Sequence, residues 1–174
     1  MPDFYGSVAG ADAYHLARAS AAWVGEDAVK QAALIRASAY IDGKYQAQNS
    51  CGRWESLFSG VKTGGRAQAL QWPRTGATDN EGHAIPADEV PIEIEQATYQ
   101  SALREIALPG SLSPDYVASQ TIKREKVGPL ETEFAVSDSA SGAGSVRPVI
   151  TVVDELLAPL LGCKTYRGVA VFVV

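Results

Sequence analysis

The residues that could do acid–base or metal chemistry are few and scattered. The chain has two histidines, His15 and His83, and we assign neither to a nucleophilic or metal-binding motif. His15 lies inside a predicted helix and is interpreted as a packing or surface histidine, whereas His83 falls in a polar turn and is interpreted as solvated. Glu93 and Glu95 are two positions apart on a predicted helix, so they point to different faces and indicate a solvated surface.

Motifs for nucleotide and acyl chemistry are missing as well. Lys62-Thr63 follows Val61 rather than the glycine of a P-loop, and there is no G-x-S-x-G elbow. Cys51 and Cys163 form no CxxC pattern, which favours reduced thiols over a disulfide framework or a metal site. We therefore predict that the protein is not an enzyme and has no catalytic residue, no cofactor and no bound metal.

Charge and hydropathy argue against two further classes of protein. The formal net charge is −5, so bulk attraction to a nucleic-acid backbone is not expected. The longest apolar run is too short to span a bilayer, and the first ten residues lack the basic and apolar regions of a secretory signal. We predict no membrane partner.

The tryptophans Trp23, Trp54 and Trp72 are the side chains best suited to stack on single-stranded bases. The basic groove that accompanies such stacking is nearly missing, since only Arg66 and Arg74 are candidates for it. We therefore favour packing roles. Trp23 is predicted to cover a helix junction, and Trp72, placed by Pro73, is predicted to fill the core.

Helical periodicity predicts the elements that position these residues. A first helix is expected over 9–22, ended by Val24-Gly25, and a second opens at Glu26-Asp27, where acids favour the helix N-terminus. Residues 46–69 have little periodicity and are interpreted as a loop with one short turn. A third helix is expected from Pro91, at its first position, to about Leu108.

The second part of the chain has a different pattern. Alternation over 121–136 predicts a β-hairpin that turns at Val127–Leu130. Its first strand carries the cations Lys123, Arg124 and Lys126, and its second carries Glu131, Glu133 and Phe134. Opposite charges facing each other would favour this pairing modestly. Residues 137–145 have the composition of a flexible linker.

A fourth helix is expected from a Thr151 cap to about Leu161, with a kink or early stop at Pro159. The last segment, Tyr166–Val174, reads as a strand that is apolar on both faces. Such a strand normally needs cover on both sides. We expect it to dock on another chain through Tyr166, Arg167, Val169, Val171, Phe172 and Val174.

These elements predict one domain over 1–174 that is mainly α. It would comprise a small helical bundle over 1–110, an extended β-hairpin over 121–136, and a C-terminal helix and strand or arm over 150–174.

Several segments, taken in order, resemble a family of small tailed-bacteriophage proteins. The family is often labelled putative DnaT-like single-stranded-DNA-binding, and it is similar to head–tail connector (adaptor, or head-completion) proteins. The segments that carry the resemblance are Ala11–His15, Trp23, Ala33–Ala37, Tyr40–Asp42, Tyr45, Leu70–Arg74, Val90-Pro91, Lys126–Pro129, Glu133–Ala135 and Asp154–Leu161.

The resemblance implies a structural virion protein of the neck, assembled in the host cytoplasm. About twelve copies would form a homo-oligomeric ring below the portal protein, joining the DNA-filled head to the tail. Its other partner would be a tail-completion (stopper) or tail terminator protein. Double-stranded DNA would pass through the lumen without specific binding, because the acidic ring repels it. The alternative is a single-stranded-DNA-binding module, as the family label suggests.

Overall fold

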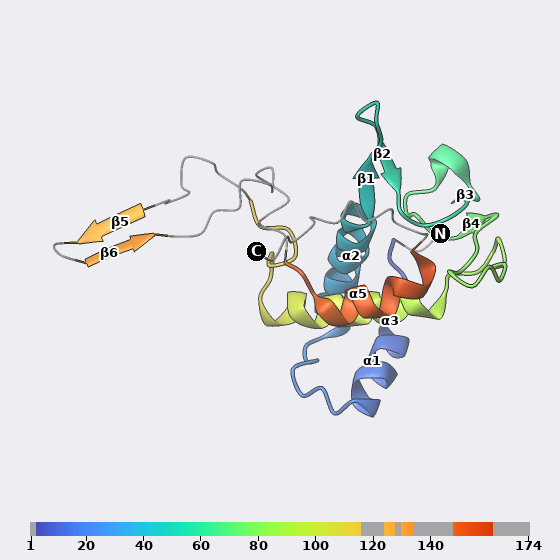
Figure 1. Ribbon diagram of the computed structural model, residues 1–174. Helices are drawn as coiled ribbons and strands as arrows, with labels where there is room; N and C mark the ends of the chain where they lie inside the picture. The colour runs from blue at the N-terminus through green and yellow to red at the C-terminus, as the bar shows by residue number, and fades with distance from the viewer. Residues whose placement is uncertain (1–2, 116–123, 128–129, 134–147, 162–174) are drawn as a thin grey trace.

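A computed structural model describes residues 3–115, 124–127, 130–133 and 148–161. The protein is mainly α with small antiparallel strand pairs, as predicted (Figure 1). The helical elements are α1 (Val8–Ala17), α2 (Asp27–Lys44), α3 (Ile92–Ala107) and α5 (Thr151–Leu157), with short 3₁₀ helices η1 (Gly65–Ala67) and η3 (Ala158–Leu160). The strands are β1 (Gln46–Gln48), β2 (Trp54–Ser56), β3 (Val61–Lys62), β4 (Arg74–Thr75), β5 (Arg124–Val127) and β6 (Leu130–Glu133).

The first two helices begin where their sequences favour a helix start. The Ser7 hydroxyl accepts a hydrogen bond from the Gly10 N–H at 3.0 Å, which caps α1. The α1 helix ends at Ala17, so the predicted helix to residue 22 was too long. Ala19 has a φ of 50°, in the left-handed region that stops a right-handed helix. The second helix begins at Asp27, as predicted.

The α3 helix packs against both α2 and α5, and small side chains are buried on α2 and α3. The fully buried residues Ala33 and Ala37 of α2, and Ala97 and Ala102 of α3, allow the backbones to approach closely. Buried hydroxyls bond within their own helices, as Ser101 donates to the Ala97 carbonyl at 2.9 Å. In Figure 1, α5 lies along α3, while α1 lies at the lower edge of the body. No helix in the described ranges has the length and apolar character needed to cross a bilayer.

The segment predicted as a loop over 46–69 contains strands instead. β1 and β2 form an antiparallel hairpin in which Gln46 pairs with Ser56, and β3 pairs with β4. The Asn49 side-chain oxygen accepts hydrogen bonds from the N–H groups of Cys51 and Arg53, both at 3.0 Å. The loop prediction was wrong for two reasons. The polar residues of this turn are those typical of a loop, and the strands are too short to show an alternation of apolar and polar residues.

The third and fourth helices differ slightly from prediction. α3 begins at Ile92, and Pro91 is its cap rather than its first residue. Thr151 is the first residue of α5 and Ile150 is the cap, so the predicted Thr151 cap was wrong. The α-helix stops at Leu157 and continues as η3, which contains Pro159. The early stop before Pro159 is therefore confirmed, as expected for a residue that has no N–H to donate.

Hydrogen bonds from α2 hold α5 in place. Asp154 accepts hydrogen bonds from the Lys44 ammonium at 2.7 Å and from the Tyr45 hydroxyl. The Tyr40 hydroxyl donates to the Pro148 carbonyl at 2.7 Å. These contacts join segments more than a hundred positions apart, so α5 belongs to the core of the helical body.

β5 and β6 pair antiparallel, as predicted for the hairpin over 121–136. Arg124 pairs with Glu133 and Lys126 with Glu131, so the basic and acidic positions are opposite each other along the backbone. The two strands pair only with each other among the described strands. Lys123, Phe134 and the predicted contact residues of 166–174 lie outside the described residues.

Candidate interaction surfaces

His15 has a packing role. It is 1% exposed, its ring stacks on Trp23 at 4.5 Å between centroids, and its Nε2 donates to the Tyr99 carbonyl at 3.1 Å. Burial lowers the pKa of this imidazole. The packing alternative is thus confirmed and the surface alternative is wrong. Trp23 is half-buried at the junction after α1, as predicted. An open cleft of about 450 Å³ lies beside this pair.

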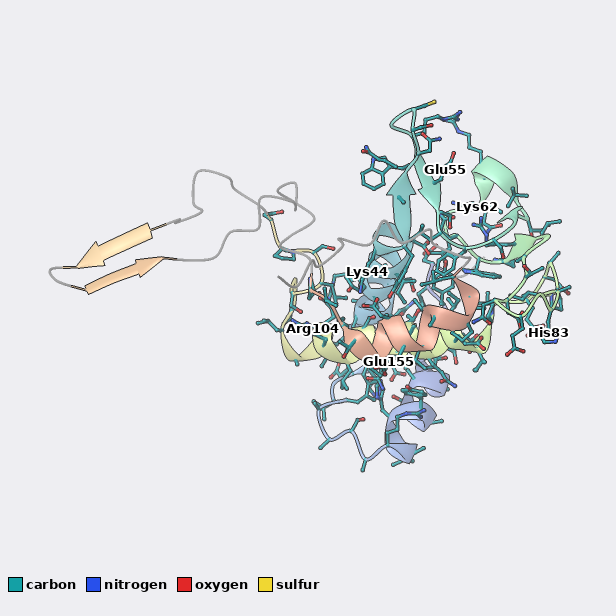
Figure 2. All side chains as sticks on the ribbon, viewed as in Figure 1. Lys44, Glu55, Lys62, His83, Arg104 and Glu155 are labelled. Carbon is teal, nitrogen blue, oxygen red and sulfur yellow. The ribbon has the colours of Figure 1, made fainter. Side chains whose placement is uncertain are left out.

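His83 is exposed, as predicted, and Figure 2 shows it at the outer edge of its loop. His83 forms a group with Asp79 and Glu81 that was not predicted, and the ligand-type atoms of the three residues lie within 4.8 Å of one another. The alternating Asp-x-Glu-x-His spacing was the available signal. Asp79 already accepts hydrogen bonds from the Glu81 and His83 N–H groups, at 2.9 and 2.8 Å. These backbone bonds, that from His83 first, hold the pKa of Asp79 below its usual range.

Glu93 and Glu95 are half-buried, so the prediction of a solvated face was wrong. Burial raises the pKa of Glu95. Glu95 lines a cavity of about 370 Å³ whose other lining residues are Asp3, Phe4, Tyr5, Gly6, Ala67, Ala69, Leu70, Trp72, Pro73 and Val90. The helix places Glu95 there because α3 starts beside the segment that contains Trp72.

The Leu70–Arg74 segment is a structural hub. Trp72 is 2% exposed and contacts Phe58 at 5.7 Å between ring centroids, which confirms its predicted place in the core. Arg74 is 4% exposed, and its guanidinium donates to the carbonyls of Ser59 and Gly60, both at 2.6 Å. Arg74 therefore ties the β3–β4 region together and is unavailable for a basic groove, contrary to its candidate role.

A buried polar network joins this hub to the first helices. Asp42 accepts hydrogen bonds from the Tyr5 hydroxyl at 2.6 Å and from the Gln71 N–H at 2.9 Å. The Trp72 N–H donates to the Tyr5 hydroxyl at 3.1 Å. Burial raises the pKa of Asp42 to about 6. The members of this network lie far apart in the chain and share no motif, so the network was not predicted from the sequence.

The tip of the β1–β2 hairpin presents an exposed aromatic and a basic side chain. Trp54 is 65% exposed and Arg53 is exposed beside it. Neither Arg53 nor Arg66, also exposed, forms an ion pair within the described ranges. Lys62 instead donates to the Gln68 and Ala69 carbonyls at 3.0 and 3.2 Å. Figure 2 shows Glu55 and Lys62 toward the same end of the molecule as this hairpin.

The β5–β6 hairpin is the second accessible surface. In Figure 1 it lies away from the helical body, with no described strand at either edge. A two-stranded ribbon leaves unpaired N–H and C=O groups along both edges, which is a template for another strand.

Comparison with known proteins gives one match. No curated protein and no solved structure is detectably similar to the chain. A family model described as "Putative DnaT-like ssDNA binding protein" matches residues 2–174. Because this match spans almost the whole sequence, the chain belongs to the family of putative DnaT-like ssDNA binding proteins.

Proposed function

We propose that this protein is a structural virion component that forms a ring below the portal. The ring joins the DNA-filled head to the tail and extends the DNA channel. The observation that carries the proposal is the contrast between a closed helical body and an unpaired ribbon. Trp72, Leu34, Ile94 and Leu157 are all 2% exposed or less, whereas β5 and β6 pair only with each other among the described strands. Edges without a described strand partner support a role for this ribbon in contacting a neighbouring chain.

Physical arguments support an assembly role for these segments. A lone two-stranded hairpin is marginally stable in water, so its edges gain most when another chain completes the sheet. The apolar segment 166–174, including Tyr166 and Phe172, suits an interface with the portal by the sequence argument. A ring of copies with a net charge of −5 each would repel DNA and let it slide.

The proposal is tested by mass in solution and by binding to the portal. Full-length protein should form, alone or on the portal, a closed ring of about twelve copies. Deleting residues 166–174 should leave a folded helical protein that no longer joins the portal. A truncated protein that unfolds would place the segment in the domain core. One that still completes heads would make the β5–β6 hairpin the docking element, which the paired charge reversals Lys126→Glu and Glu131→Lys would test.

A second candidate function is single-stranded-DNA binding, which the family description and the exposed Trp54 favour. An exposed indole beside an unpaired arginine is the usual means of stacking a base and holding its phosphate. We expect binding weaker than about 10⁻⁶ M at physiological salt, because the net charge is −5. Oligo-dT titration of wild-type protein, Trp54→Ala and the matched control Trp23→Phe tests this. Submicromolar affinity with a steep salt dependence, lost only in Trp54→Ala, would make this the leading function.

A further inference from the structure

The α1 cleft, the open hollow of about 450 Å³ beside His15, has an apolar wall at the protein surface. Leu16 lines it and is 83% exposed, and Trp23 is half-buried in the same wall. The exposed alanines Ala19 and Ala21 also line the cleft, and their short side chains leave it open. Its volume lies within the range of pockets that hold a bound group, roughly 300–1,000 Å³.

One carboxylate of the α1 cleft is only partly used. Asp12 accepts hydrogen bonds from the Trp23 indole at 2.6 Å and from the Lys30 ammonium at 2.8 Å. Both bonds are to Oδ1, and Oδ2 accepts no hydrogen bond from the described residues. The Asp12 side chain is 44% exposed, so Oδ2 can accept from a cation of another molecule. The cleft therefore favours an apolar group with a positive charge next to it.

The tip of the β1–β2 hairpin presents such a pair. Trp54 is 65% exposed, and the neighbouring Arg53 is exposed and forms no ion pair within the described ranges. The Asn49 side chain holds the turn, because it accepts hydrogen bonds from the N–H groups of Cys51 and Arg53. Tryptophan and arginine are the residue types that most often dominate protein interfaces.

The two surfaces lie at opposite ends of the molecule, as Figure 1 shows for α1 and the β1–β2 hairpin. The α2 helix separates them, since Lys30 near its start lines the α1 cleft and β1 follows its end. An α-helix of 18 residues is roughly 27 Å long. The hairpin tip is therefore too far away to enter the cleft of its own chain, and the partner that it fits is a second copy.

We propose that the Trp54 indole of one copy inserts into the α1 cleft of the next copy, where Arg53 pairs with Asp12. A contact between two different surfaces of one chain repeats from copy to copy, and it closes into a ring when the rotation allows. Each copy then has two neighbours, one at its hairpin and one at its cleft. This inference rests on the proposed function, because it names the contact that joins the copies of the ring.

Disulfide trapping between copies tests the proposal, with the native, exposed Cys51 at the hairpin tip as one thiol. In a Cys163→Ser background, Ala21→Cys supplies the second thiol in the cleft wall. The matched control is Ala107→Cys, an exposed alanine at the end of α3 that does not line the cleft. We expect Ala21→Cys to give a ladder of cross-linked multimers about tenfold faster than the control, at a rate that rises with protein concentration.

Substitutions on both sides of the contact sharpen the test. Trp54→Ala and Leu16→Ser should each slow the trapping about tenfold, and neither should disturb the fold, because both side chains are mostly in water. Arg53→Glu should also slow it, whereas Arg66→Glu, at another exposed arginine, should not. Circular dichroism checks that each variant is folded.

The other outcomes overturn the inference. An intrachain disulfide, formed at a rate independent of concentration, would show that the hairpin folds back onto its own cleft. Equal rates for Ala21→Cys and the control, or a rate unchanged by Trp54→Ala, would show that the cleft does not hold the indole. Trapping at the control rate, with oligo-dT binding that Trp54→Ala abolishes, would assign the hairpin tip to DNA.

Ring mass and portal binding, measured on the wild-type protein, report separately on the proposed function. A closed ring whose copies trap only at the control rate refutes the inference and leaves the proposed function in place. Rapid trapping in a protein that neither closes a ring nor joins the portal supports the contact between copies and refutes the proposed function.

Discussion

Trp72 and Trp54 lie in neighbouring segments of one chain, yet their environments are opposite. Trp72 is 2% exposed inside the helical body, whereas Trp54 is 65% exposed on the β1–β2 hairpin. Around Trp72 the polar groups are bonded to distant segments, as Gln71 is to Asp42 and Arg74 to Ser59. Around Trp54 the hydrogen bonds are local, as in the Asn49 turn. The first region maintains the fold, and the second presents a surface.

The largest expected effect comes from removing the buried indole. Trp72→Ala should lower the free energy of unfolding by about 3–5 kcal/mol, because it leaves a cavity in the core. Chemical denaturation monitored by circular dichroism measures this. If Trp72→Ala were as stable as the wild type and lost oligo-dT binding instead, the division between a structural and a surface tryptophan would be wrong.

A smaller effect is expected at the polar centre of the same region. Asp42→Asn should cost about 2–3 kcal/mol near pH 4, because the amide NH₂ cannot accept the Gln71 N–H while the amide oxygen accepts from Tyr5. The cost should shrink toward neutral pH, where only the wild type carries a buried charge. The pKa of Asp42 is raised from 3.8 to about 6, so its contribution to stability is complete below pH 3.8 and is lost as the pH rises through 6. Unfolding titrations from pH 3.5 to 7 should show this trend in the wild type and not in Asp42→Asn.

His15 should show the opposite pH trend. Burial lowers its pKa below 6.5, so its contribution to stability is present above pH 6.5 and is lost as the pH falls. His15→Gln should cost about 1–2 kcal/mol at pH 7.5 through lost packing on Trp23. The gap between variant and wild type should narrow toward pH 5. A constant gap in parallel thermal melts would contradict the neutral, buried imidazole.

The smallest effect on stability is expected at the exposed tryptophan. Trp54→Ala should change the free energy of unfolding by no more than about 0.5 kcal/mol, because its indole is mostly in water. Binding assays with oligo-dT and with the portal then show which partner, if either, uses this surface. A loss of stability near that of Trp72→Ala would mean that the hairpin belongs to the core.

Prediction from the sequence succeeded where the helical periodicity was strong or where the residues that start and stop helices were clear. α2 and α3 begin within about one residue of their predicted starts, and Pro159 ends α5 as expected. It failed where the decisive contacts are long-range. The 46–69 segment carries strands of two or three residues, too short for alternation to register. The place of Glu95 beside Trp72, and the contacts of Arg74 with Ser59 and Gly60, could not be predicted from local spacing.

The sequence by itself determined the helix-forming segments, the antiparallel hairpin with one basic and one acidic strand, and the resemblance to the family. These follow from local propensity, alternation and short motifs. Only the tertiary structure decided that Trp72 is enclosed while Trp54 is exposed, and that Asp42, Tyr5 and Gln71 form one network. Burial depends on which distant segments cover a side chain. That coverage is set by the packing of α2, α3 and α5, which no local pattern around either tryptophan contains.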